Sequence, residues 1–139
     1  MYPARRKPIA HEHNEQVKLF RWAFSNEDIH PELKMMFAVP NGGVRGGNPR
    51  QRTINGLRLK QEGVRNGVPD IFLAVPKGIY HGLFIEMKHG KNVMSEDQVK
   101  WKDKLLSFGY DFSLCYSYEI AKTRILEYLD LEPTNLPLN

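Results

Sequence analysis

The sequence lacks several features that would assign it to a familiar class. It has a single cysteine, Cys115, in 139 residues. An internal disulfide and a cysteine-based zinc finger are therefore excluded, and a cytoplasmic or otherwise intracellular location is expected. No apolar run approaches the roughly 20 residues of a membrane-spanning helix. The basic start at Arg5, Arg6 and Lys7 is not followed by the apolar stretch of a secretion signal. We therefore expect no membrane association.

Two common catalytic motifs are also absent. The glycine-rich segment 42–47 lacks the Gly-Lys-Ser/Thr ending of a P-loop, so no nucleotide cofactor is expected. His11-Glu12 begins the zinc-protease pattern, but Glu15 stands where that pattern requires its second histidine. The glycines of segment 42–47 are better explained by a flexible loop.

Positive charge is present and concentrated. The net charge is +4, which alone says little about partners. Between Asn41 and Asn66, however, six cations face a single acid, Glu62. These cations are Arg45, Arg50, Arg52, Arg58, Lys60 and Arg65. Such a cluster is typical of a phosphate-binding surface, so we predict that these six residues bind DNA; a solvated basic loop is the alternative.

The hydrophobic pattern predicts an α/β fold. Helices are expected from His11 to Phe24, Arg50 to Glu62, Ser95 to Phe108 and Ser117 to Asp130, and strands at Lys34–Val39, Asp70–Val75, Tyr80–Lys88 and Asp111–Tyr116. Val17, Phe20 and Phe24 form an apolar stripe on the first helix, and Ser95 with Gln98 forms a capping box. This alternation favours a mixed central sheet flanked by helices.

Two carboxylates are expected to meet across the central hairpin. Alternation places Glu86 and Lys88 on one face of their strand together with Phe84, whereas Leu83, Ile85 and Met87 point to the core. If Pro76 pairs with Tyr80, Asp70 falls directly opposite Glu86, with Cβ atoms about 4.5–5.5 Å apart. Two opposed carboxylates repel each other unless a positive charge lies between them.

A divalent cation would supply that charge. Ligation by oxygen alone suits Mg²⁺ or Mn²⁺ better than zinc. Lys88 could then neutralise charge that develops on a phosphate, or orient the attacking water. The simpler alternative is an ordinary surface ion pair between Lys88 and one of the acids, worth about 0–1 kcal/mol.

These residues resemble a known family. Pro69-Asp70 with Glu86-Met87-Lys88 is similar to the PD-(D/E)XK nuclease motif, and the string from Gly63 to Asp70 resembles the signature of its VRR-NUC branch, the virus-type replication-repair nucleases. The helix that begins near Glu12 and the Ser95–Gln98 segment complete that pattern. Asn66 departs from it, standing where a second arginine is found in a Val-Arg-Arg string.

The resemblance implies a restriction-endonuclease-like fold and DNA hydrolysis with Mg²⁺ or Mn²⁺. The implied metal ligands are Asp70, Glu86, the main-chain carbonyl of Met87 and an acid of the first helix. Glu15 is favoured as that acid, with Glu12 as the rival. Lys88 is the implied catalytic lysine, and Gln98 is expected near the site.

The implied protein is a stand-alone, homodimeric nuclease that resolves four-way (Holliday) junctions and acts in DNA repair. A non-catalytic, structure-specific DNA-binding module is the alternative, as is a flap or restriction-type nuclease. The intact trio of Asp70, Glu86 and Lys88 favours an enzyme. We expect a basic arm at residues 1–10, the nuclease domain at 11–130 and a loose tail at 131–139.

Overall fold

The computed structural model describes residues 9–40 and 47–131, with side chains from His11 onward. Its elements are α1 (Ile9–Asn26), the 3-10 helix η1 (Pro31–Met35), β1 (Met36–Ala38), α2 (Pro49–Gln61), β2 (Ile71–Leu73), β3 (Leu83–Met87), α3 (Glu96–Ser107), β4 (Asp111–Cys115) and α4 (Tyr118–Leu129). The predicted order of helices and strands is confirmed, and η1 replaces the start of the first predicted strand. Arg45, residues 1–8 of the predicted arm and residues 132–139 of the predicted tail lie outside the described residues.

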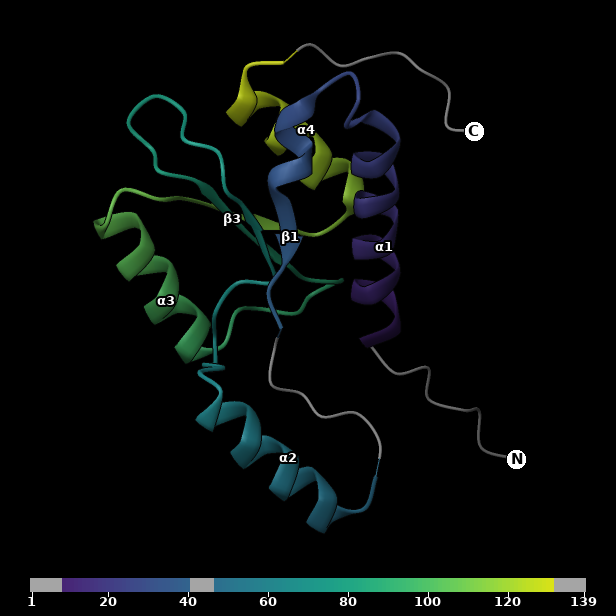
Figure 1. Ribbon diagram of the computed structural model, residues 1–139, viewed down its shortest axis with the longest axis vertical. Coiled ribbons are helices and arrows are strands. Elements are labelled where there is room, and N and C mark those ends of the chain that lie inside the picture. Colours follow the sequence, from purple (N-terminus) through teal and green to yellow (C-terminus); the bar gives the residue numbers. More distant parts are fainter. Residues whose placement is uncertain (1–8, 41–46, 132–139) are drawn as a thin grey trace.

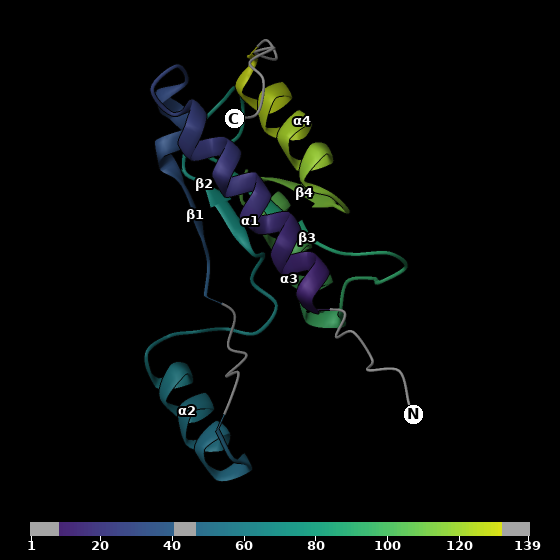
Figure 2. The ribbon, with the colours of Figure 1, turned by 90° about the vertical axis from the view of Figure 1, so that its right-hand side faces the viewer.

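The strands form a mixed four-stranded sheet, which confirms the predicted fold class. The order is β1-β2-β3-β4, antiparallel except for the parallel pair β3–β4, which α3 connects. Helices α1 and α4 lie on one side of the sheet and α3 on the other (Figures 1 and 2). Within the described ranges, no helix combines the length and the apolarity that crossing a membrane requires.

The core side of α1 differs from its most obvious apolar stripe. Leu19, Trp22 and Ala23 are buried against the sheet, whereas Val17 and Phe24 are exposed. Both sets follow helical spacing, and periodicity alone does not tell which of two neighbouring apolar sides meets the sheet. Val17 and Phe24 are therefore left on the surface of α1, whereas Phe20 packs partly against the core.

The hairpin has the predicted register where the acids lie. Ile71 pairs with Ile85 and Leu73 with Leu83, an alignment that sets Asp70 opposite Glu86. The expected pairing of Pro76 with Tyr80 is wrong, since Lys77 pairs with Tyr80 instead. Proline has no amide N–H to donate, whereas the backbones of Lys77 and Tyr80 exchange hydrogen bonds of 3.0 and 2.9 Å. Between the Leu73–Leu83 pair and the Lys77–Tyr80 pair, three residues (74–76) therefore face two (81–82), and regular strand pairing ends at Leu73 and Leu83.

Candidate active site

Two buried acids form the centre of the site. Glu86 lies on β3 with only 2% of its surface exposed, and Asp70 precedes β2 directly opposite. Burial, and then the negative charge of Asp70, raise the pKa of Glu86 from 4.5 to about 8. Burial also raises the pKa of Asp70, although its hydrogen bond with Met87 and the charge of Lys88 oppose the shift. The fold thus holds two carboxyl groups where full ionisation of both is unfavourable.

Main-chain and side-chain donors orient this pair. The Met87 amide donates to Asp70 Oδ2 at 2.9 Å, and the Gln98 side-chain amide donates to Glu86 Oε1 at 2.8 Å. The same oxygen of Glu86 lies 3.5 Å from Lys88 Nζ. Because these donors come from β3 and α3, both carboxylates are held by regular secondary structure.

The second oxygen of Glu86 is left without a partner. Glu86 Oε2 is buried, and the described residues give it no hydrogen bond. Leaving a buried acceptor unsatisfied costs about 1–3 kcal/mol, and more when the group is charged. The Lys88–Glu86 contact does not relieve this cost because it involves the other oxygen. The site therefore contains a buried carboxyl oxygen without a donor, which a cation would stabilise once Glu86 has lost its proton.

Gln98 reaches Glu86 because α3 begins nearby. The Gln98 side-chain oxygen accepts from the Ser95 amide at 2.8 Å, which confirms the predicted capping box. Gly67 makes this approach possible. It has a φ of +87°, and a Cβ there would lie 2.7 Å from the backbone of Asp97 in the first turn of α3. The loop before Asp70 thus packs on the turn that carries Gln98.

The structure places the two candidate acids of α1 in different surroundings. Glu15 accepts a hydrogen bond from the Tyr118 amide at 2.8 Å and lies 3.3 Å from Lys18 Nζ. Its carboxylate stabilises the N-terminus of α4. The charge of Glu12 contributes instead to the raised pKa of Asp70. The structure thus brings Glu12 into electrostatic contact with the acidic pair and binds Glu15 to α4.

Contacts that the sequence did not indicate hold Glu12 in place. Asn92 donates to Glu12 at 3.3 Å, and its own carbonyl accepts from the Tyr116 hydroxyl at 3.0 Å. The His11 and His89 rings stack at 4.4 Å between centroids. These pairs join residues far apart in sequence, so no local motif marks them. They attach the first turn of α1 to the loop that follows Lys88.

The residues present fit a magnesium-like cation. Within the described part of the chain, no group of three or more His, Cys, Asp or Glu side chains is arranged as a metal cage. Mg²⁺ usually binds through one or two carboxylates and retains several waters. Asp70 and Glu86 match that requirement, and the unpartnered Glu86 Oε2 supplies an oxygen that no donor occupies.

The predicted DNA-binding cations lie apart from the acidic pair. Arg50, Arg52, Arg58 and Lys60 are exposed on α2, and Arg65 is exposed in the loop that follows. Helix α2 stands away from the sheet and its helices in both views (Figures 1 and 2). The sixth predicted cation, Arg45, is outside the described residues. The structure thus separates a basic helix from the site and joins the two by the 62–69 loop.

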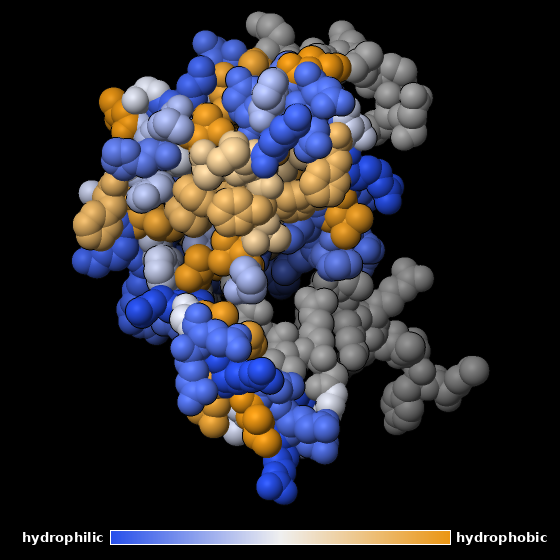
Figure 3. Space-filling view, viewed as in Figure 1, coloured by the Kyte–Doolittle hydropathy of each residue, from blue (hydrophilic) through white to orange (hydrophobic). Residues whose placement is uncertain are grey.

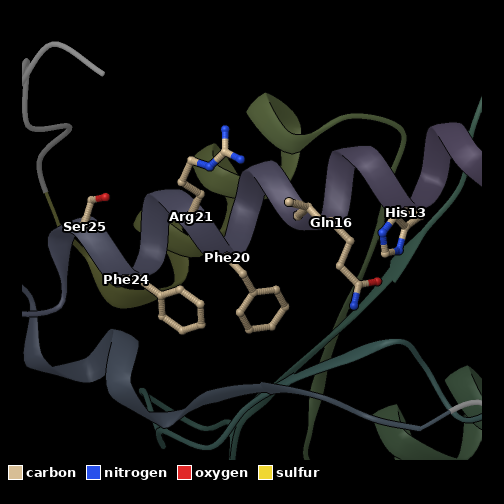
Figure 4. Close-up of a pocket in the computed structure, with 7 residues that line it drawn as sticks. His13, Gln16, Phe20, Arg21, Phe24 and Ser25 are labelled. Atoms are coloured by element: carbon tan, nitrogen blue, oxygen red, sulfur yellow. The ribbon is translucent and has the colours of Figure 1, made fainter. Parts of the chain in front are cut away.

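The apolar stripe of α1 lines a shallow surface groove away from the acids. Figure 4 shows Phe20 and Phe24 pointing to the same side of the helix, with Arg21 and Ser25 on the other. The groove is lined by His13, Gln16, Val17, Phe20, Arg21, Phe24 and Ser25. Since no carboxylate lines it, this groove is not a second candidate for the chemistry predicted at Asp70 and Glu86.

Comparison with known proteins links this geometry to a family. The sequence model of the VRR-NUC domain matches residues 13–119. A solved structure described as a "VRR_NUC domain protein" is similar with a TM-score of 0.65 and 20% sequence identity, covering 87% of this chain and 89% of that chain. At that identity the likeness concerns the fold. The search of curated proteins found no match.

The raised pKa of Glu86 predicts how stability varies with pH. In the metal-free protein, stability should fall as pH rises from about 4.5 to about 8, because the folded state holds a proton that the unfolded state has released. Glu86→Gln is neutral throughout and should reduce this fall. Thermal unfolding in EDTA across this range measures the effect. The same pH dependence in both proteins would contradict it.

Proposed function

The chain belongs to the VRR-NUC family of PD-(D/E)XK-type nucleases, and from this premise we propose that it is a metal-dependent endonuclease that hydrolyses phosphodiester bonds in branched DNA. The observation that carries the proposal is the buried pair of Asp70 and Glu86, whose unpartnered oxygen Glu86 Oε2 fits a divalent cation. Mg²⁺ and Mn²⁺ suit these oxygen ligands.

Each residue of the pair has a defined task. Asp70, Glu86 and the main-chain carbonyl of Met87 would hold the cation. When bound, the cation polarises the phosphate and makes its water more acidic. The Met87 amide fixes Asp70 and the Gln98 amide fixes Glu86, so the carboxylates need not reorganise when substrate arrives.

Lys88 is placed to act on the phosphate. Its side chain is 14% exposed and its Nζ lies 3.5 Å from Glu86 Oε1, so the side chain is largely shielded from water and directed to the acidic pair. There it would neutralise negative charge on the scissile phosphate and orient the attacking water. Glu12 is the acid of α1 that we assign to this site, acting through water on the cation or its ligands.

The non-catalytic alternative explains less of the site. Buried ion pairs add little stability, and apolar residues of similar volume often stabilise a protein more. A fold that served only to bind DNA would have no need of two buried acids beside a nearly buried lysine. Retaining Asp70, Glu86 and Lys88 together is consistent with catalysis.

An exposed apolar surface favours association with a second copy of the chain. Exposed fractions reach 41% for Val17, 65% for Phe24, 50% for Met35 and 48% for Phe37. Figure 3 shows apolar side chains in a band over β1 and the adjoining side of α1. In the described sheet β1 is an edge strand, and exposed edges beside apolar patches favour association.

A homodimer built on this band would suit branched DNA. Twofold symmetry places two identical active sites at a fixed separation. Two such sites could make paired nicks on a four-way junction. A flap nuclease would cut a single strand and would not need this symmetry, and a restriction-type nuclease would need additional base-reading elements.

Cleavage should depend on the acidic pair and on a divalent cation. We expect a labelled four-way junction to be cut with Mg²⁺ or Mn²⁺ but not in EDTA. Asp70→Asn, Glu86→Gln and Lys88→Ala should each slow cleavage by about a hundredfold or more while DNA binding persists. Lys104→Ala, an exposed lysine at the end of α3, is the matched control. Binding to junction, flap and duplex without cleavage under any metal would favour the non-catalytic module.

The two acids of α1 should respond differently to neutralisation. Glu12→Gln should slow cleavage, and a higher Mg²⁺ concentration should partly restore the rate. Glu15→Gln should leave cleavage near the wild-type rate but lower the free energy of unfolding by about 0.5–2 kcal/mol, because the N-terminus of α4 loses its acceptor. Cleavage kinetics and urea unfolding separate the two effects. Loss of cleavage in Glu15→Gln at unchanged stability would reverse the assignment.

The apolar band predicts the state of association. Sedimentation at micromolar concentration should show a dimer for the wild type and a monomer for Phe24→Glu. Ile79→Glu makes the same change at another exposed apolar residue, on the hairpin turn, and should remain dimeric. A monomeric wild type at the concentration used for cleavage would exclude the homodimer.

A further inference from the structure

Helix α2 has no packing partner in the described part of the chain. None of its 13 residues is buried, and Figures 1 and 2 show it projecting from the rest of the molecule. A lone helix of this length is only marginally stable in water, and Gly56 in its interior lowers its stability by about 1 kcal/mol. The capping box of Asn48 and Gln51 supports its N-terminus, and backbone hydrogen bonds from Gly63 and Val64 support its C-terminus, but neither contact fixes where the helix lies. An external partner is therefore needed to fix this helix.

The charges of α2 identify the kind of partner. The helix carries Arg50, Arg52, Arg58 and Lys60 and no acid between Pro49 and Gln61. Cations in a first turn oppose the positive end of the helix dipole, so Arg50 and Arg52 destabilise the isolated helix. An anionic partner beside Arg50 lowers that penalty. Arg58 lies 3.5 Å from Glu62 in an exposed ion pair, a weak contact that a phosphate can replace.

The positions of the side chains around the axis of α2 indicate which anionic partner fits the helix. At about 100° per residue, Arg50, Ile54 and Leu57 share one side. Ile54 and Leu57 are 53% and 58% exposed, so this side is turned to solvent. Arg58 and Lys60 flank it, each about 70–90° away.

The opposite side of α2 is the less exposed one. Gly56 and Leu59 are half-buried there, and the Leu59 carbonyl accepts from the Val64 amide at 2.9 Å. Arg52 shares this side, roughly 180° from the apolar one. The helix thus has a less exposed side and an outer side with an apolar centre, Arg50 in line with that centre and one further cation on each flank.

An apolar strip between two cations matches the major groove of duplex DNA. The groove is about 12 Å wide and admits an α-helix. Its floor presents base edges, including thymine methyl groups, and a wall of phosphates rises on each side. A second copy of the chain would suit Ile54 and Leu57, whereas the two phosphate walls of the groove would also suit the cations Arg58 and Lys60.

We propose that α2 is a groove-binding helix, with Ile54 and Leu57 on the floor of the major groove and Arg58 and Lys60 on opposite phosphate walls. The inference rests on the proposed action on DNA and assigns to α2 the binding of the duplex next to the cleavage site. The 62–69 loop joins this helix to Asp70, so the proposed DNA-binding helix and the first acid of the pair belong to one continuous stretch of chain.

Binding in EDTA tests the proposal without requiring cleavage. The affinity of the wild type for a short duplex is measured against salt concentration and compared with that of Arg58→Ala, Lys60→Ala and Arg52→Ala. The two flank variants should each lower the slope of log affinity against log salt by about 0.9, the value of one lost phosphate contact. Arg52→Ala removes the same charge from the opposite side of the helix. The sequence grouped Arg52 with the DNA-binding cations, but this geometry predicts that the variant keeps the wild-type slope.

A groove-specific competitor provides the second measurement. Methyl green, which occupies the major groove, should displace the protein, whereas netropsin, which occupies the minor groove, should not. Equal slope losses for Arg52→Ala and Arg58→Ala, or displacement by netropsin alone, would overturn the proposal.

A role for α2 between two copies of the chain would also overturn it. In that case Ile54→Ser with Leu57→Ser would dissociate a dimer in sedimentation, whereas the flank variants would bind DNA as the wild type does. Absence of cleavage together with the predicted salt slopes would remove the nuclease proposal and leave the groove-binding helix standing.

Discussion

The burial of two opposed carboxylates is the constraint on which the rest of the site depends. Asp70 and Glu86 can share the ends of β2 and β3 only if something offsets their repulsion and their loss of water. Part of this cost is offset by two hydrogen bonds, from the Met87 and Gln98 amides, and by the charge of Lys88. The remainder is centred on Glu86 Oε2, which has no partner among the described residues. We propose that a bound cation completes the site.

The surrounding fold can be understood as support for that pair. Gly67 allows the loop before Asp70 to pack against α3, which positions Gln98. The first turn of α1 is attached through Asn92 to the loop after Lys88, which positions Glu12. Outside this cluster, α2 and the apolar band over β1 contribute nothing to the acidic pair. We assign them instead to the DNA duplex and to a second copy of the chain.

Features set by local chemistry could be predicted from the sequence. The alternation around Glu86 and the hairpin spacing gave the register that opposes Asp70 and Glu86, and Ser95 with Gln98 gave the start of α3. Features set by tertiary packing could not. Glu12 and Glu15 lie one turn apart on α1, and only the positions of Tyr118 and Asn92 separate their surroundings. Likewise, two neighbouring apolar sides of α1 fit the same periodicity, and the sheet buries Leu19 rather than Phe24.

Calorimetric titration with Mn²⁺ in the absence of DNA tests the central claim most directly. We expect one saturable site in the wild type near pH 7 and none in Glu86→Gln. Binding should release a proton, detected as a dependence of the enthalpy on the buffer, because the pKa of Glu86 is raised to about 8 in the metal-free protein. Equal binding by both proteins, or binding without proton release, would contradict the claim that the buried pair holds the cation.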